Sequence, residues 1–353
     1  MENQKYSGIN GLRAISIILV VIYHLTYQDK IFHGLYEIRW LLPVVSFLQD
    51  GHLGVNIFFV ISGFLITSLL LREELKTKTI SLKNFYIRRT LRIFPAYYFL
   101  LLVYFFLQQL GVFELSATSW ITSLTYTKYF NWEKDWLTSH AWSLSIEEHF
   151  YLFWPLFFMA GDKFRKIAAI VLIASVPFMR VYFDYHDLSE HYALTLFTRI
   201  DAIATGCLFA LYRNKIIEKI SPWWNPVFIV SSFLLISLRY FPLLATKIHL
   251  EFIFVPLGTT HGTIANFLIA IILMYSVFGP NGIWSKFLNW KLLNYVGLLS
   301  YSIYLWQQIF ISGLDYWPAK FPQNIFCVLA MALFSYHLLE KPFLKLKSKF
   351  SII

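Results

Sequence analysis

Residues 51–71 read GHLGVNIFFVISGFLITSLLL and contain no Asp, Glu, Lys or Arg. A helix of about twenty apolar residues is long enough to cross the hydrocarbon core of a bilayer. Uncharged runs of similar length occur at 93–113, 220–238, 292–314 and 321–339. The chain is 58% hydrophobic and 14% charged, whereas soluble domains are about 25% charged. We therefore expect an all-α, integral membrane protein.

Further spans are expected where an apolar segment includes ionisable residues. Four segments of this kind lie at 8–28, 141–160, 167–183 and 192–212. Another crossing is expected at about 263–279, after a re-entrant or interfacial piece that contains Gly258 and His261. No repeat of 20–50 residues divides the sequence. These patterns predict a polytopic helix bundle of about ten spans that forms one domain, residues 1–353.

The basic residues indicate the orientation. If the N-terminus lies inside, the inner segments hold twenty of the Lys and Arg residues and the outer segments hold eight, as the positive-inside rule requires. The sequence thus predicts N-in and C-in. This bias explains most of the net charge of +10, so we expect no nucleic-acid partner. The first span lacks a signal-peptidase-like site and is expected to stay in the mature chain.

Cys207 and Cys327 lie in separate apolar stretches. We therefore expect neither a disulfide framework nor a Cys-based metal site.

The span at 8–28 carries Arg13 and His24, eleven residues apart. In a helix this spacing is about 1100° of rotation and about 16 Å of rise, so both residues share a face at opposite depths. Arg13 is expected near the cytoplasmic end. His24 is expected near the outer end, where a neutral imidazole can take a proton from a hydroxyl. The alternative is a snorkelling arginine and a histidine bonded to a neighbouring helix.

The span at 141–160 carries Glu147 and Glu148, which we expect one to two turns deep and level with His24. A carboxylate there could orient an imidazole and stabilise its charge. Adjacent helical residues point about 100° apart, so only one of the pair would face His24. An ion pair with Arg199 is the structural alternative.

The span at 192–212 carries Arg199 and Asp201 in its outer half. Two residues apart on a helix, they face different directions, so each needs its own partner. Arg199 could pair with a glutamate of the neighbouring span or bind an oxyanion. Charged residues within a membrane are costly and usually functional.

Three arginines, Arg88, Arg89 and Arg92, begin the third span on the cytoplasmic side. Arg88 and Arg92 are spaced i, i+4 and share a face, which suits the binding of phosphate by guanidinium groups. The alternative is a role in topology and contact with anionic lipid.

The segment at 111–140 contains Tyr126, Tyr129, Trp132 and Trp136 among polar residues. They could form an aromatic belt at the membrane interface. They could instead stack against the sugar rings of a glycan.

These residues together resemble the acyltransferase 3 family of integral membrane proteins, which O-acylate extracytoplasmic glycans and other acceptors. The resemblance covers most of the chain in order: Gly11-Leu12-Arg13 with His24, Asn56-Ile57-Phe58-Phe59 with Ser62-Gly63-Phe64, Arg88-Arg89 with Arg92-Ile93-Phe94-Pro95, Trp142-Ser143-Leu144-Ser145 with Glu147-Glu148, Arg199 with Asp201, Ser300 to Trp306, and Glu340-Lys341-Pro342. His149 and Gln307 depart from the residues often found at these positions, which could affect how the acceptor fits.

The resemblance implies acetyl-CoA as the acyl donor, His24 as the catalytic residue and no metal. We expect three groups of site residues: His24, Glu147 and Glu148 as catalytic; Arg13, Arg88, Arg89 and Arg92 as donor-binding; and Arg199, Asp201, Ser143, Trp132 and Trp136 as acceptor-binding or supporting. The pantetheine arm of acetyl-CoA is comparable in length to the ~16 Å between Arg13 and His24. His24 would act as general base or as a transient acetyl carrier.

The expected acceptor is a surface polysaccharide such as lipopolysaccharide O-antigen, reached from the outer face of a bacterial cytoplasmic (inner) membrane. Some relatives carry an additional periplasmic hydrolase-like domain, and the end of this sequence at residue 353 predicts a stand-alone form. One alternative is a non-enzymatic transporter or flippase of a lipid-linked saccharide. Another is the same fold with a different short acyl-CoA or a small exported acceptor.

Overall fold

The computed structural model describes residues 6–28, 42–131, 133, 135–186, 188, 195–238 and 262–350. This part of the chain is all-α and contains no β-strand, which confirms the predicted fold class. The α-helices are α1 (Ile9–Gln28), α2 (Leu42–Leu48), α3 (Gly51–Thr77), α4 (Leu82–Gln109), α5 (Ala117–Leu124), α6 (Trp136–Ser139), α7 (Ala141–Met159), α8 (Asp162–Tyr185), α9 (Thr195–Leu211), α10 (Arg213–Ile220), α11 (Trp224–Ser237), α14 (Thr263–Phe278), α15 (Ile283–Leu288), α16 (Lys291–Phe310), α17 (Gln323–Phe334) and α18 (Lys341–Ser348). Short 3-10 turns at Lys128–Phe130, Ser221–Trp223 and Trp317–Ala319 and a π-helical turn at Ser335–Glu340 complete the described elements.

Each expected span coincides with a helix of the structure. Within the described residues, six helices are long and apolar enough to cross a membrane: Ile9–Gln28, Gly51–Thr77, Leu82–Gln109, Asp162–Tyr185, Arg213–Ser237 and Gln323–Ser348. The count of about ten spans and the N-in, C-in orientation stay predictions. The re-entrant piece expected around Gly258 and His261 lies outside the described residues.

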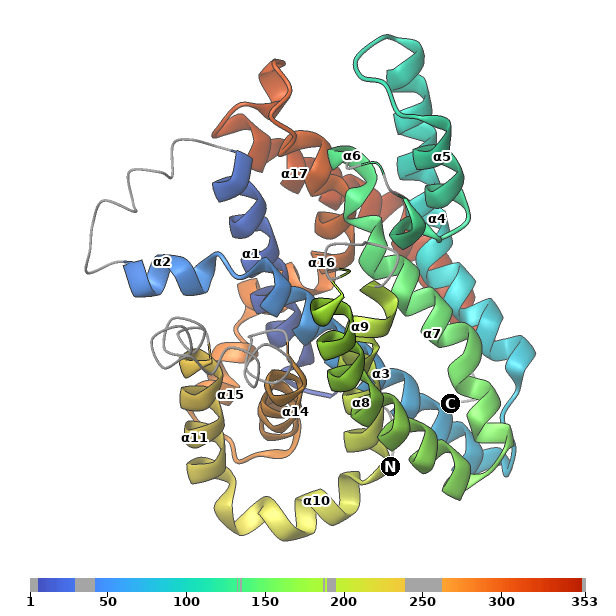
Figure 1. The fold of residues 1–353 in the computed structure, drawn as a ribbon, viewed down its shortest axis with the longest axis vertical. Helices are drawn as coiled ribbons and strands as arrows, with labels where there is room; N and C mark the ends of the chain where they lie inside the picture. The colour runs from blue at the N-terminus through green and yellow to red at the C-terminus, as the bar shows by residue number, and fades with distance from the viewer. Residues whose placement is uncertain are drawn as a thin grey trace.

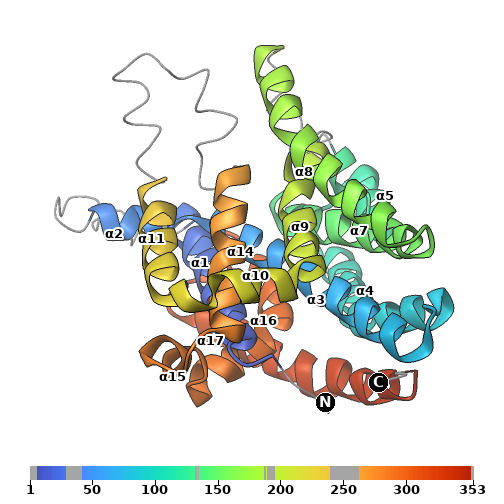
Figure 2. The same cartoon turned by 90° about the horizontal axis from the view of Figure 1, so that it is seen from below.

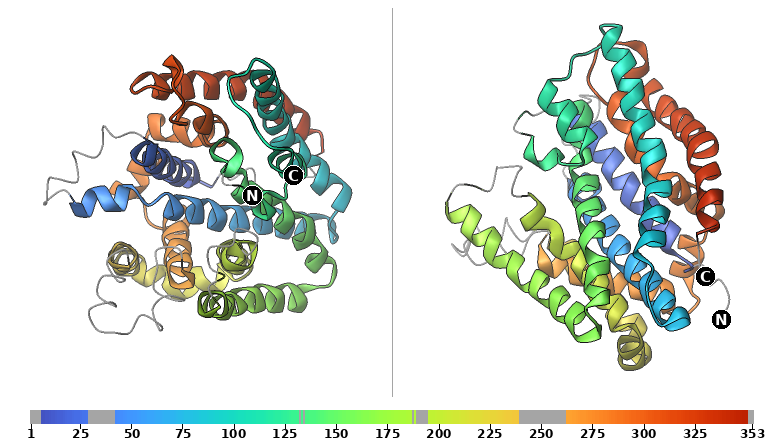
Figure 3. Two further views of the ribbon diagram at one scale, coloured as in Figure 1. Left: turned by 45° about the horizontal axis from the view of Figure 1, so that its top comes forward. Right: turned by 90° about the vertical axis from the view of Figure 1, so that its right-hand side faces the viewer.

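Helix α3 crosses the middle of the bundle and packs against α1, α7, α9 and α14 (Figure 3). Helix α16 lies against the other side of α1, while α4 and α11 lie at opposite edges of the molecule (Figure 1). At the C-terminal end, α18 runs alongside α4 (Figure 2). The fold thus surrounds α1 and α3, the two helices that carry the first two motifs.

Close contact between α3 and α9 depends on glycine. A Cβ atom added to Gly63 would lie 1.9 Å from the carbonyl oxygen of Ile203, and one added to Gly206 would lie 2.1 Å from that of Val60. Small residues allow the backbones of membrane helices to approach in this way. The contact fixes α9, and therefore Arg199, relative to α3.

Polar side chains define the ends of α3 and α4. The Asp50 carboxylate accepts a hydrogen bond of 2.8 Å from the Leu53 N–H at the start of α3, and Ser81 Oγ accepts one of 3.3 Å from the Asn84 N–H at the start of α4. These side chains satisfy backbone donors that a helix N-terminus leaves free. The turn between the two helices carries Lys78 in the left-handed region, with a φ of 63°.

Candidate functional site

Two cavities lie along α1, one towards each end of the helix. The cavity lined by Asn10 and Arg13 has a volume of about 590 Å³, and the cavity lined by His24 and Tyr27 has a volume of about 550 Å³. We call them the inner and the outer cavity, following the predicted orientation. Val55 of α3 and Tyr304 of α16 line both. The two cavities therefore approach each other across these two side chains.

The inner cavity is rich in arginine. Its wall contains Arg13, Arg72, Arg89 and Arg92. The same wall contains two carboxylates, Glu147 and Glu340, which act electrostatically on both Arg13 and Arg92. Each carboxylate accepts a hydrogen bond from a serine, Glu147 from Ser62 at 2.8 Å and Glu340 from Ser302. Four cations against two anions leave the wall positively charged, as an anionic ligand requires.

The arginines at the start of α4 do not act as one group. Arg92 lies in the inner cavity wall, and the Arg89 guanidinium lies 4.4 Å from the ring centroid of Tyr151. Arg88 instead forms an ion pair of 2.6 Å with Glu73 and donates a hydrogen bond of 2.9 Å to the Phe350 carbonyl. Arg88 therefore joins α3, α4 and the segment after α18, and the expected pairing of Arg88 with Arg92 around one phosphate is not found.

The expected contact between Glu147 and His24 is also not found. Glu147 lines the inner cavity, whereas His24 lines the outer one. The error lies in the depth that the sequence analysis assigned to Glu147 within α7. Ser139, His140 and Trp142 already line the outer cavity, so Glu147 lies at the inner one. Glu148 lines neither cavity, and its Oε1 atom is buried without a hydrogen-bond partner.

The imidazole of His24 lies in an aromatic part of the outer cavity. Its ring contacts the edge of Trp136, with centroids 5.3 Å apart, and Trp136 stacks on Tyr27 at 5.6 Å. The indole N–H of Trp136 donates to the Ile311 carbonyl at 2.7 Å, which fixes the ring. The Nδ1 atom of His24 is buried without a hydrogen-bond partner. The structure thus brings the predicted residues His24 and Trp136 together, while Trp132 lies outside the described residues.

A second histidine, His140, was missed in the sequence. It is 4% exposed, lines the outer cavity, and both of its ring nitrogens lack hydrogen-bond partners. It is close enough to His24 to act on it electrostatically. The Tyr304 hydroxyl donates to the His140 carbonyl at 2.8 Å and lies 2.6 Å from Ser143 Oγ. The available signal was its position two residues before the start of the Trp142–Ser145 motif.

Arg199 and Asp201 have separate surroundings. The Asp201 carboxylate accepts hydrogen bonds of 2.8 and 2.9 Å from Arg180 and one of 2.6 Å from Thr263. Arg199 lines the outer cavity, where its Nη2 lies 3.5 Å from Nδ1 of His52. Asp201 therefore holds α8, α9 and α14 together, and Arg199 is free to face the cavity.

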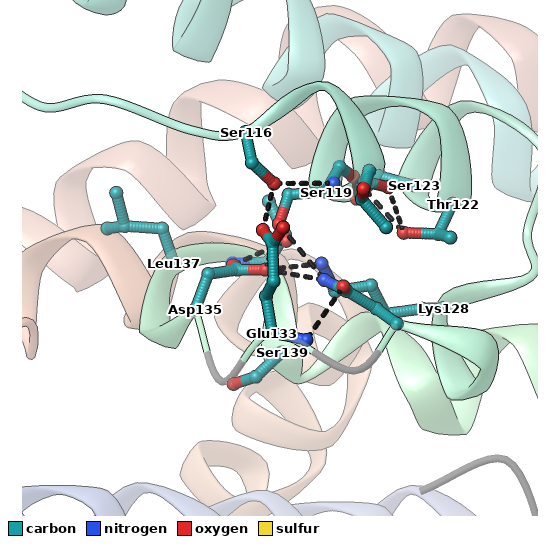
Figure 4. Close-up of polar contacts among 12 residues, drawn as sticks. Ser116, Ser119, Thr122, Ser123, Lys128, Glu133, Asp135, Leu137 and Ser139 are labelled. Carbon is teal, nitrogen blue, oxygen red and sulfur yellow. Dashed lines mark hydrogen bonds and ion pairs between the residues drawn. The ribbon is translucent and has the colours of Figure 1, made fainter.

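A buried polar network holds the wall that carries Trp136 (Figure 4). The Asp135 carboxylate accepts hydrogen bonds from Lys128 at 2.5 Å, Ser119 at 2.6 Å, Asn131 at 3.1 Å, and both the N–H and hydroxyl of Thr138 at 2.8 and 2.6 Å. Burial acts to raise the pKa of Asp135, but the Lys128 ammonium and these hydrogen bonds lower it below its ordinary value. Lys128, Asn131 and Asp135 all line the outer cavity.

Comparison with known proteins identifies the family of the chain. Residues 6–339 match the family model Acyl_transf_3, described as an acyltransferase domain. The O-acetyltransferase OatA of Staphylococcus aureus (strain NCTC 8325 / PS 47) is 29% identical over 382 residues, which covers 98% of this chain and 58% of the relative. YrhL of Bacillus subtilis (strain 168), whose name assigns it provisionally to peptidoglycan O-acetylation, is 27% identical over 385 residues, with 97% and 55% covered.

The chain spans a little over half the length of these curated relatives. No solved structure matches it. The family match covers nearly all described helices, the whole outer cavity and the inner cavity apart from Glu340 and Leu344. It confirms the resemblance seen in the sequence. This chain belongs to the acyltransferase 3 family.

Proposed function

We propose that this protein is a membrane-bound O-acetyltransferase that transfers an acetyl group from cytoplasmic acetyl-CoA to a hydroxyl of an extracytoplasmic glycan. The observation that carries the proposal is the pair of cavities, one rich in arginine and one containing His24, that meet at Val55 and Tyr304. A donor and an acceptor that enter from opposite faces would need this arrangement.

The inner cavity suits the donor. Arg13, Arg72, Arg89 and Arg92 would bind the phosphates of acetyl-CoA, because guanidinium groups donate paired hydrogen bonds to phosphate oxygens. Apolar side chains such as Phe58 and Ile61 line the same cavity and would pack against the pantetheine arm. We do not include Arg88 among the phosphate-binding residues, because its guanidinium group already forms an ion pair with Glu73.

The outer cavity suits the hydroxyl acceptor. With its neutral imidazole, His24 would take the hydroxyl proton while the hydroxyl oxygen attacks the thioester carbonyl. The new C–O ester bond forms, the C–S bond breaks, and the thiolate of CoA leaves and takes up a proton. In the alternative route, a ring nitrogen of His24 accepts the acetyl group first and then passes it to the acceptor oxygen. The buried Nδ1 without a partner supports a role in either route.

The glycan acceptor is supported by the aromatic surface beside His24. Trp136 and Tyr27 present stacked rings to the outer cavity, and aromatic faces pack well against the C–H surfaces of sugars. The name of YrhL favours peptidoglycan among extracytoplasmic glycans. Lipopolysaccharide O-antigen, the first choice from the sequence, is a second glycan of the same class. Transfer from cytoplasmic acetyl-CoA to either acceptor would require the protein to lie in a bacterial cytoplasmic membrane.

The test uses the purified full chain in detergent with radiolabelled acetyl-CoA and a β-1,4-linked N-acetylglucosamine oligomer. We expect labelled acetyl ester on the oligomer, and we expect His24→Ala to abolish transfer while acetyl-CoA still binds. Arg92→Ala should raise the Kd for acetyl-CoA at least tenfold, whereas Lys163→Ala, an exposed change on the same side, should not. Normal turnover by His24→Ala, or unlabelled glycan transport without acetylation, would contradict the proposal.

A further inference from the structure

Arg199 faces the outer cavity and has no ion-pair partner among the described residues. Its Nη1 atom is buried and has no hydrogen-bond partner, and its Nη2 atom has a single long contact of 3.5 Å with His52. In the part of the chain that the structure describes, no carboxylate forms an ion pair with Arg199. A guanidinium cannot lose its charge at physiological pH, so this cation is present whatever the pH of the cell surface.

The carboxylates around Arg199 are already engaged. Asp201 accepts hydrogen bonds from Arg180 and Thr263. Asp135 forms its ion pair with Lys128. Among the carboxylates of the outer cavity wall, Glu133 is exposed and accepts a hydrogen bond from Ser116. Asp50 accepts a hydrogen bond from the Leu53 N–H. Asp201 and Asp50 act favourably on Arg199 electrostatically, but no described carboxylate forms an ion pair with it.

Arg199 is partly buried, and its buried Nη1 atom has lost its hydration without gaining a hydrogen bond in return, which is unfavourable. An anionic ligand would supply the missing acceptors, and carboxylates and phosphates match the paired donors of arginine. We propose that the outer cavity binds an acceptor that carries a carboxylate or phosphate, and that Arg199 binds this anionic group. The inference rests on the proposed function and narrows its acceptor class to anionic glycans.

The position of Arg199 fits an acceptor held at two points. His52, which Arg199 contacts, has its ring 6.0 Å from that of Tyr23, and the Tyr23 ring lies 5.3 Å from that of His24. All four residues line one cavity. An anionic group at Arg199 and a hydroxyl at His24 would therefore belong to neighbouring parts of one acceptor molecule. Specificity would come from Arg199 and reactivity from His24.

The test compares three soluble probes that differ in charge: methyl β-D-glucuronide, α-D-glucose 1-phosphate and neutral methyl β-D-glucoside. Binding to the purified full chain is measured by calorimetry without acetyl-CoA, and acetyl transfer to each probe is measured separately. We expect at least one anionic probe to bind tenfold or more tightly than the glucoside. Preference for the glucuronide would indicate a carboxylate-bearing glycan, and preference for the phosphate would indicate a phosphate-linked glycan.

Variants connect this preference to Arg199. Arg199→Gln should reduce the ratio of anionic to neutral binding to about one, and Arg199→Lys should retain part of it because the charge remains. Retained acetyl-CoA binding shows that each variant is folded. Lys320→Gln removes an exposed cation of 60% side-chain exposure and should leave the ratio unchanged.

Equal binding of all three probes by the wild-type chain would overturn the inference, as would an Arg199→Gln variant that keeps the anionic preference. If Arg199→Gln lost turnover equally with charged and neutral acceptors, the inference would also be overturned. Arg199 would then take part in the reaction itself rather than bind the anionic group of the acceptor. If neither these probes nor the N-acetylglucosamine oligomer is acetylated but anionic binding still depends on Arg199, the proposed function fails and the anion site stands.

Discussion

Replacing Asp135 with asparagine removes the central charge of the outer cavity wall while preserving the size of the side chain. In the wild-type structure, one carboxylate oxygen accepts from the Thr138 N–H and hydroxyl, and the other accepts from Lys128, Ser119 and Asn131. All five partners are donors. An asparagine keeps one acceptor oxygen and replaces the other with an NH2 group, which is itself a donor. Depending on its orientation, this NH2 group faces the two donors of Thr138 or the three donors of Lys128, Ser119 and Asn131.

The size of the effect follows from burial. The side chains of Lys128 and Asp135 are 3% and 16% exposed. Removing one partner of a buried ion pair costs about 3–5 kcal/mol, and the partial exposure of Asp135 places the expected loss near the lower end. A loss of about 3 kcal/mol corresponds to a roughly hundredfold change in the ratio of folded to unfolded protein. Trp136, the next residue, would no longer be held against His24.

The assay measures three quantities for Asp135→Asn: the free energy of unfolding in detergent, the KM for the glycan oligomer and the Kd for acetyl-CoA. We expect the free energy of unfolding to fall by about 3 kcal/mol and the KM for the glycan oligomer to rise at least tenfold. The Kd for acetyl-CoA should stay unchanged, because the donor binds in the other cavity. Asp315→Asn is the matched control, since it removes an exposed ion pair with Lys320 and should change none of them. Unchanged stability and KM in Asp135→Asn would refute the assigned role.

The pH dependence gives an independent check of the same pair. Although burial opposes the effect, the Lys128 ammonium lowers the pKa of Asp135 in the folded state. A carboxylate with a lowered folded pKa stabilises the fold above its ordinary pKa, and this contribution is lost as the pH falls through the folded value. The difference in unfolding free energy between wild type and Asp135→Asn should therefore have its largest value at neutral pH and vanish at strongly acidic pH. A difference that is constant with pH would contradict this.

Two further predictions test the packing and the orientation. Gly63→Ala places a Cβ 1.9 Å from the Ile203 carbonyl oxygen, so α3 and α9 must separate, and the unfolding free energy should fall by about 1–3 kcal/mol; Gly282→Ala, where a Cβ meets nothing within 4 Å, should have no comparable effect. A cysteine at exposed Lys78 should be shielded from an impermeant thiol reagent in intact cells, whereas one at Leu110, 77% exposed, should react. The reverse labelling pattern would overturn the predicted orientation.

The helical fold and the placing of Arg13 and His24 towards the two ends of one helix could be predicted because each leaves a local signal. Uncharged runs near twenty residues locate helices such as α3, and the small residue Gly63 within that run is where α3 meets α9. Arg13 and His24 share α1, so their spacing alone placed them towards its two ends. Each of them lines a cavity in the structure.

Features that depend on tertiary contacts could not be predicted in the same way. The depth of Glu147 was wrong because the sequence does not show that His140 and Trp142, at the start of α7, line the outer cavity, which places Glu147 at the inner one. The ion pair of Arg88 joins α4 to Glu73 of α3, and an i, i+4 pattern carries no information about partners on another helix. The Asp135 network likewise depends on how α5 packs beside α6. Helix periodicity describes one helix at a time, whereas these contacts are set by several.

The central claim is that the donor and the acceptor are used from opposite faces of the membrane, and vesicles of known orientation test it most directly. Acetyl-CoA is supplied only on the face of the inner cavity and the glycan oligomer only on the face of the outer cavity, with a vesicle that contains the His24→Ala chain as background. The two-cavity arrangement predicts labelled glycan on the outer face while acetyl-CoA stays on the inner one. Labelling that occurs only when both compounds are on the same face would contradict the account.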